Sequence, residues 1–205
     1  MDRRGQATNA GSVAYAPGSA WSHPFRAVWR FGQRHPVFRF VLGVGVLMGA
    51  FYAIYLPEWK YDAAGWFLSW NLPLHAEVTG AVLRLLGTDA HVSGTFVEAP
   101  LFQMEVVRGC DALEPAALFL AAVLAFPVRI RTKVVGAVVG ILCMEATNVV
   151  RLVTLFYVGA FWPNHFRMMH EDVWQASFIV LSVVYWAIWA LWASRPPVRR
   201  THVPD

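Results

Sequence analysis

Long apolar stretches restrict the fold of this chain more than any other feature of its sequence. Three of them, residues 37–56, 134–159 and 173–193, reach the roughly 20 mostly apolar residues that a helix needs to cross a bilayer. A fourth, 112–127, is shorter and spans only if its ends snorkel or the bilayer thins locally. The hydrophobic content of 57%, with only 15% charged residues, is too high for an ordinary soluble domain. We therefore predict an all-α membrane protein with about four transmembrane helices.

The basic residues predict how these helices are oriented. With four spans, twelve of the seventeen Lys and Arg residues fall on one side, together with only two acids, Asp2 and Asp205. Lys and Arg flanking a span favour the cytoplasmic side, so we predict that both termini are cytoplasmic. This clustering at the ends of spans also accounts for the net charge of +4 without a nucleic-acid partner. The twelve residues are Arg3, Arg4, Arg26, Arg30, Arg34, Arg39, Arg129, Arg131, Lys133, Arg195, Arg199 and Arg200.

The chain is expected to form one membrane-embedded domain over residues 37–193, with basic cytoplasmic tails at 1–36 and 194–205. The first 20 residues are rich in Gly, Ala and Ser and have little to bury, so part of the N-terminal tail is predicted to be disordered. No small-residue cleavage site follows the first apolar stretch, and we expect that stretch to remain as an anchor.

The external segment, residues 57–111, carries its own structural signals. Aromatic and aliphatic residues over 62–87 are spaced as in amphipathic helices, and Pro73 is expected to divide them into two short helices at the outer interface. The alternation in HVSGTFVE and LFQMEVV favours a small β-hairpin. This hairpin would lead the chain directly to Cys110.

Three chemically distinctive residues are expected at the outer membrane face. Cys110 precedes the second span, Arg151 lies in the outer third of the third, and His170 precedes the fourth. The connections PVRIRTK and FWPNHFRMMHED are predicted to be short loops, so these spans should be antiparallel neighbours. An arginine inside an apolar helix costs roughly 2.5 to 3.5 kcal/mol on insertion scales and usually faces a cavity or a partner. A thiolate is a strong nucleophile, and cations and a helix N-terminus predict a lowered pKa for Cys110.

Several neighbours are candidates for supporting roles around these three residues. Asn148 and Thr147 lie one turn before Arg151 and either orient its guanidinium, line the same pocket or make ordinary interhelical hydrogen bonds. The predicted supporting residues are Asn148, Thr147, Arg108, Glu114 and His165.

Each of the three central residues also has a purely structural interpretation. Cys110 can be a packing residue at a helix end. Arg151 can snorkel to the interface or pair with Glu145, and His170 can be solvated, with His165 nearby as a competitor. Their common depth in the membrane favours function, because a nucleophile needs a proton carrier within reach.

Three motifs contain these residues: GCDALEP with Cys110, NVVRLVTLFYVG with Arg151, and NHFRMMHEDVWQ with His170. Through these three motifs, the stretch from about 102 to 193 resembles the exosortase and archaeosortase family of membrane-embedded cysteine transpeptidases. The small size, GCxxLE and LAFP are most similar to the exosortase H subgroup. The chain departs from the family at Ala112, where the usual residue is Gly.

The resemblance implies a multi-pass enzyme of the bacterial inner membrane whose active site faces the periplasm. Its partners would be the membrane and exported proteins that end in a sorting signal, made of a short motif, one transmembrane helix and a basic tail. In this scheme Cys110 is the nucleophile, Arg151 stabilises the oxyanion and His170 is the general acid and base. The substrate proteins, the acceptor and the oligomeric state stay open.

Two other classes of protein remain as alternatives. A four-helix membrane thiol-disulfide oxidoreductase needs two cooperating cysteines, whereas Cys143 lies about 12 Å deeper than Arg151 along the helix. A small transporter or assembly scaffold would use Arg151 as a counter-ion for its substrate. The histidines lack the spacing of metal ligands, and no phosphate-binding loop is present, so neither a metal nor a cofactor is predicted.

Overall fold

The computed structural model describes residues 36–55 and 61–195. The helices and strands pack as one unit, which runs from Val37 onward. The predicted tails at 1–36 and 194–205, with the disordered stretch at 1–20, lie almost entirely outside the described residues.

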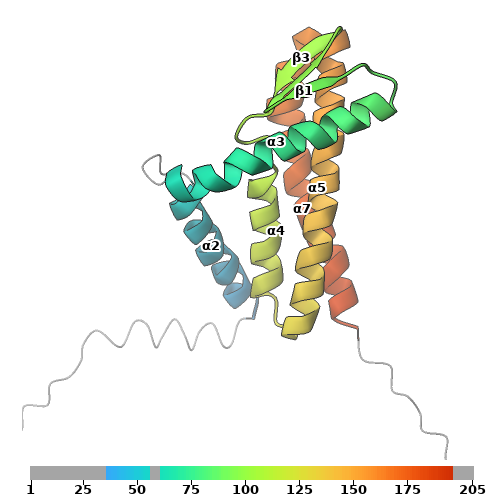
Figure 1. Cartoon of the computed structure of the whole chain (residues 1–205). Coiled ribbons are helices and arrows are strands. Elements are labelled where there is room, and N and C mark those ends of the chain that lie inside the picture. Colours follow the sequence, from blue (N-terminus) through green and yellow to red (C-terminus); the bar gives the residue numbers. More distant parts are fainter. Residues whose placement is uncertain (1–35, 56–60, 196–205) are drawn as a thin grey trace, which may run out of the picture. The chain divides into compact units, whose positions relative to one another are not determined.

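Helices dominate this unit, as predicted (Figure 1). Three helical stretches are long and apolar enough to cross a membrane within the described ranges: α2 (Pro36–Tyr55), α5 (Ile130–Phe161) and the region 163–193 that ends in α7 (Trp174–Ala193). The predicted fourth span forms helix α4 (Leu113–Ala125), which is apolar but has only 13 residues. Its rise of about 20 Å is less than the roughly 30 Å of a hydrocarbon core.

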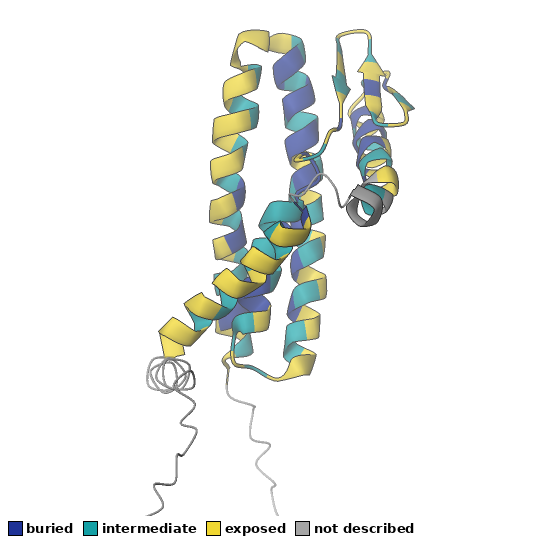
Figure 2. Cartoon of the chain, turned by 90° about the vertical axis from the view of Figure 1, so that its left-hand side faces the viewer, coloured by how far each residue is buried: buried dark blue, intermediate teal, exposed yellow. Residues whose placement is uncertain are grey.

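Helix α4 packs between α5 and α7 through small residues. A methyl group at Gly140 would overlap the ring of Phe119 from α4, and one at Gly136 would overlap Trp189 from α7. Glycines therefore let these helices approach closely, as in many membrane bundles. Helix α2 is different, because its apolar residues are largely exposed (Figure 2).

The external segment begins with a single helix, α3 (Tyr61–Leu85), so the prediction of two helices broken at Pro73 is wrong. A proline removes one backbone hydrogen bond and often ends a helix, but tertiary packing can carry the helix through it. Here Ala76 and Leu83, downstream of the proline, are fully buried in a cluster with Phe156 of α5. Figure 1 shows α3 lying across the bundle.

The predicted hairpin is present as part of a three-stranded antiparallel sheet. Its strands are β1 (His91–Ser93), β2 (Phe96–Ala99) and β3 (Phe102–Glu105), in that order. Val97 in the central strand is fully buried, whereas its neighbours point outward, which matches the alternation in the sequence. A ring from β3, that of Phe102, packs against Gly159 and fixes the sheet on α5.

The connection between α5 and α7 is helical rather than a loop, contrary to the prediction. It contains the 3₁₀ turn Pro163–His165, the short helix α6 (Phe166–Met168) and a π-helical turn, Met169–Val173. Such π-helical turns often mark functional sites, because they change the direction of one side chain within a helix.

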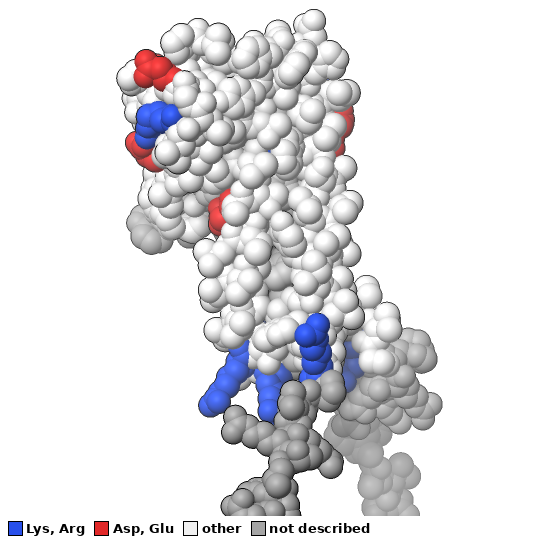
Figure 3. Space-filling model, turned by 90° about the vertical axis from the view of Figure 1, so that its right-hand side faces the viewer, with Lys and Arg blue, Asp and Glu red and all other residues white. Residues whose placement is uncertain are grey.

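One end of the bundle carries basic but not acidic side chains in Figure 3. These basic side chains gather where α4 turns into α5, whereas the acidic side chains in view lie toward the opposite end, together with a basic one. We call the first the basic end. The described basic residues in these terminal and turn regions are Arg39, Arg129, Arg131, Lys133 and Arg195.

Candidate active site

Cys110 lies in a tight turn between the sheet and α4, residues 106–112, which we call the cysteine turn. Its backbone N–H donates a hydrogen bond of 2.9 Å to the carbonyl of Val107, and Gly109 has a φ of +89°. Ala112, which precedes α4, has a φ of +51°. Among the residues that the structure describes, it is the one residue other than glycine with a left-handed backbone. Glycine adopts this conformation without strain, whereas alanine does not. The usual glycine of the resembled family thus fits the geometry at position 112.

Two side chains of α5 hold this turn. The Arg151 Nη1 donates to the carbonyl of Gly109 at 3.2 Å, and the Asn148 Nδ2 donates to the carbonyl of Cys110 at 2.8 Å. The Arg151 guanidinium also lies over the ring of Phe178, 5.4 Å from its centroid. Arg151 and Asn148 are both buried, so the predicted arginine faces the bundle interior and does not snorkel.

His170 reaches the same turn from the π-helical segment. Its Nε2 lies 3.5 Å from the Cys110 Sγ, which is within hydrogen-bond reach of a sulfur atom. The imidazole stacks on Phe166 with ring centroids 5.9 Å apart and planes 8° apart, which orients it. The structure therefore brings the three predicted residues together. His170 contacts the Cys110 thiol directly, whereas Arg151 binds the backbone carbonyl of Gly109, the residue before Cys110.

The environment of the thiol differs from the one predicted. Cys110 is only 5% exposed, and burial raises the pKa of its thiol, although the nearby Arg151 opposes this. The prediction of a lowered pKa is therefore wrong, because desolvation outweighs the cations. Arg108 contributes little to the thiol, since its guanidinium lies over the ring of Tyr55 at 4.2 Å and donates to the Tyr55 carbonyl.

Asp111 is a polar residue of the site that was not predicted from the sequence. It is 1% exposed; its Oδ1 accepts a hydrogen bond of 3.3 Å from the Leu113 N–H, and its Oδ2 has no hydrogen-bond partner. Burial raises the pKa of this carboxyl. An acidic residue directly after the cysteine, at the start of an apolar stretch, was the signal that could have identified it.

A cavity of about 480 Å³ opens beside this turn, between α2, the start of α4 and α7. We call it the site cavity. Gly109, Asp111 and Arg151 line it near the cysteine, and the predicted supporting residue Glu114 lines it as well. Glu114 also interacts with Tyr52 of α2. Tyr52 was not predicted as a site residue, because no sequence motif contains it.

Two predicted supporting residues lie elsewhere. The Thr147 hydroxyl donates to the carbonyl of Cys143 at 2.8 Å and is 2.9 Å from the Tyr185 hydroxyl on α7, which matches the interhelical alternative. His165 is exposed at the end of the 3₁₀ turn.

Glu145 does not pair with Arg151 but with His75, whose Nε2 is 2.7 Å from its carboxylate. The His75 Nδ1–H donates to the carbonyl of Asn71 at 2.8 Å. Burial lowers the pKa of His75, but these two partners raise it, and the result lies above the usual value. The pair joins α3 to α5, which leaves the Arg151 guanidinium available to the cysteine turn.

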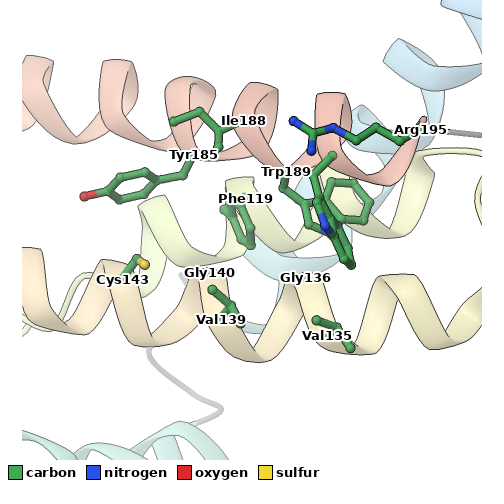
Figure 4. Close-up of a pocket in the computed structure, with 11 residues that line it drawn as sticks. Phe119, Val135, Gly136, Val139, Gly140, Cys143, Tyr185, Ile188, Trp189 and Arg195 are labelled. Carbon is green, nitrogen blue, oxygen red and sulfur yellow. The ribbon is translucent and has the colours of Figure 1, made fainter. Parts of the chain in front are cut away.

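Both cysteines are free, and they lie in different surroundings. Cys143 lines a separate cavity of about 510 Å³ with Tyr185 and Trp189, shown in Figure 4. Nothing in residues 36–55 and 61–195 groups three or more His, Cys, Asp or Glu side chains so that they could hold a metal ion.

These features describe a helical membrane protein in which a buried cysteine, a buried arginine and a half-buried histidine lie close together. A family model described as transmembrane exosortase (Exosortase_EpsH) matches residues 26–189, which is most of the chain. The protein belongs to the transmembrane exosortase family, as its motifs predicted. No curated protein and no solved structure matches the chain.

Proposed function

We propose that this protein is a cysteine transpeptidase or protease that cleaves C-terminal sorting signals of exported proteins. The contact of 3.5 Å between the Cys110 Sγ and the His170 Nε2 is the observation that carries the proposal. A nucleophile and a base within hydrogen-bond reach are the minimum that covalent acyl transfer requires.

In the proposed reaction, His170 Nε2 takes the proton of the Cys110 thiol, and the thiolate attacks the scissile carbonyl carbon. Burial raises the pKa of the Cys110 thiol and lowers the pKa of His170, and both shifts favour the neutral pair at rest, so we propose that proton transfer accompanies the attack. His170 then donates this proton to the leaving amine as the C–N bond breaks, which leaves a thioester on Cys110. Water or an amine attacks the thioester and restores the thiol.

Arg151 stabilises the oxyanion that forms during both attacks. Its Nη1 already donates to the Gly109 carbonyl, which fixes the guanidinium beside the nucleophile. Its Nε is buried and has no hydrogen-bond partner, so this donor remains for the substrate. A positioned donor away from water acts more strongly on developing charge than a solvated one.

We further propose that the protein lies in the bacterial inner membrane with its basic end in the cytoplasm and Cys110 toward the periplasm. The positive-inside rule supports this orientation. Reporter fusions after Arg131 and after Arg195 should be cytoplasmic, and one after Asn164 should be external. The reverse pattern would place the thiol on the wrong side for an exported substrate.

The test of the activity is cleavage in cells of a tagged protein that ends in a motif, an apolar helix and a basic tail. Wild type should shorten it on a gel, and Cys110→Ala should not. Cys143→Ala is the matched control and should process normally. Processing by Cys110→Ala would refute the proposal, and loss of activity in Cys143→Ala would instead favour a two-cysteine oxidoreductase.

A further inference from the structure

Two residues that line the site cavity each carry a buried polar atom without a hydrogen-bond partner. Asp111 Oδ2 is an acceptor and Arg151 Nε is a donor; their residues are 1% and 3% exposed, and both line the cavity. A buried polar atom without a partner is unfavourable, which makes a ligand that supplies one favourable. An acceptor and a donor together match the N–H and C=O groups of an extended peptide. The cavity volume of about 480 Å³ falls within the range of binding sites for small molecules or short peptide segments.

A second cavity continues from the first along α4. It has a volume of about 300 Å³ and is almost entirely apolar, with Val44 of α2 and Val183 of α7 on its two sides. The two cavities share Leu118 as a lining residue. Together they form a groove between α2 and α7 that is polar beside the cysteine turn and apolar farther along the bundle.

Helix α2 forms one wall of this groove and is attached mainly near its ends. At one end Phe40 stacks on Trp186 with centroids 5.1 Å apart, and Gly43 lies against Ala125. At the other end Tyr55 contacts Arg108. Figure 1 shows α2 and α4 diverging toward α3.

We propose that the substrate enters this groove sideways from the membrane, between α2 and α7. The extended segment with the scissile bond occupies the site cavity, where Asp111 accepts a main-chain N–H and Arg151 donates to a carbonyl. The membrane helix that follows lies along the apolar second cavity. The order of polar and apolar surface in the groove matches the order of motif and helix in such a substrate. This inference rests on the proposed function.

The cavity in Figure 4 provides an internal comparison. It is as large as the site cavity and also opens between helices, but it lies on α5 and α7 and contains neither Asp111 nor Arg151. Ile179 lines the site cavity and Ile188 lines this other cavity, and they are 54% and 61% exposed on the same helix. The two isoleucines are therefore a matched pair of positions for a probe.

The experiment places the photo-crosslinking residue benzoylphenylalanine at Ile179 or at Ile188 of the full chain, in the Cys110→Ala background that keeps the substrate intact. The probe is a tagged protein that the wild type shortens in the same cells. We expect its crosslink from Ile179 and not from Ile188. The proposal that the substrate binds in the groove would be overturned by a crosslink from Ile188 alone, by equal crosslinks from both positions, or by none from either. If the wild type shortens no such protein, the proposed function fails first, and the two failures are thus distinguishable.

A second variant tests the acceptor role of Asp111. Asp111→Asn keeps the shape of the side chain but replaces one oxygen by an NH2 group, which cannot accept a hydrogen bond. Because the remaining oxygen already accepts from the Leu113 N–H, the substrate N–H loses its acceptor, and the Ile179 crosslink should weaken about tenfold. The control Asp89→Asn removes a charge at an exposed position and should leave the crosslink unchanged. An undiminished crosslink in a folded Asp111→Asn variant would contradict this assignment.

Discussion

The Cys110 Sγ lies 3.5 Å from the His170 Nε2, although 60 residues separate the two along the chain. The turn after the sheet supplies the thiol, and a π-helical turn before α7 supplies the imidazole. Asn148 and Arg151 of α5 hold the cysteine turn in place through hydrogen bonds to its backbone carbonyls.

His170→Ala should reduce processing by roughly 10²- to 10⁴-fold, because the thiol loses its base and the leaving amine its acid. His165→Ala should have no effect, since that histidine is exposed outside the site. The measurement is the initial rate of substrate shortening for both variants at equal protein level. Normal processing by His170→Ala, with loss in His165→Ala, would exchange the roles of the two histidines.

Arg151→Lys keeps the positive charge but loses the planar arrangement of donors. If the guanidinium stabilises the oxyanion, the lysine variant should be nearly as slow as Arg151→Ala, with kcat lower by roughly 10²- to 10³-fold. Arg84→Lys is the control, because Arg84 also donates to a backbone carbonyl, that of Ala90, on α3. Near-normal kcat in Arg151→Lys would show that only charge matters at this position.

The pH dependence of alkylation reports the pKa of the thiol. Burial raises the pKa of Cys110, so its thiolate should appear at higher pH than that of a small model thiol. In a Cys143→Ala background, the labelling rate should therefore reach half its maximum above the pH found for the model compound. This midpoint does not depend on how slowly the reagent reaches a buried site. A midpoint below that of the model thiol would mean that Arg151 and the helix end outweigh desolvation.

Ala112 adopts a left-handed backbone that favours glycine. Ala112→Gly should therefore stabilise the folded protein by about 1 kcal/mol, measured as a higher thermal midpoint in detergent. Ala117→Gly within α4 is the control and should destabilise by a similar amount, about 1 kcal/mol. A lower midpoint in Ala112→Gly would show that the Ala112 methyl group contributes packing that exceeds the backbone strain.

The membrane class and the grouping of three residues could be predicted from the sequence because both depend on local signals. Apolar stretches of sufficient length define spans, and short connections bring their ends to a common face. Cys110 and His170 lie at such ends and Arg151 lies in the outer third of its span, which is why their meeting could be expected.

The remaining differences arise from packing that no local pattern encodes. Pro73 breaks helices in general, but buried neighbours carry α3 past it. Thr147 and Asn148 are adjacent on α5, yet only Asn148 faces the cysteine turn, since Thr147 faces Tyr185. The thiol pKa was predicted with the wrong sign because the degree of burial of Cys110 depends on the whole bundle.

The central claim is that Cys110 forms a thioester with the substrate. Its most direct test is the intact mass of the detergent-purified protein, quenched with acid soon after mixing with a substrate that it shortens in cells. We predict a mass increase equal to the N-terminal product less one water, located on Cys110, released by hydroxylamine, absent in Cys110→Ala and present in Cys143→Ala. Cleavage of the same substrate by Cys110→Ala, or an adduct located on Cys143, would contradict it.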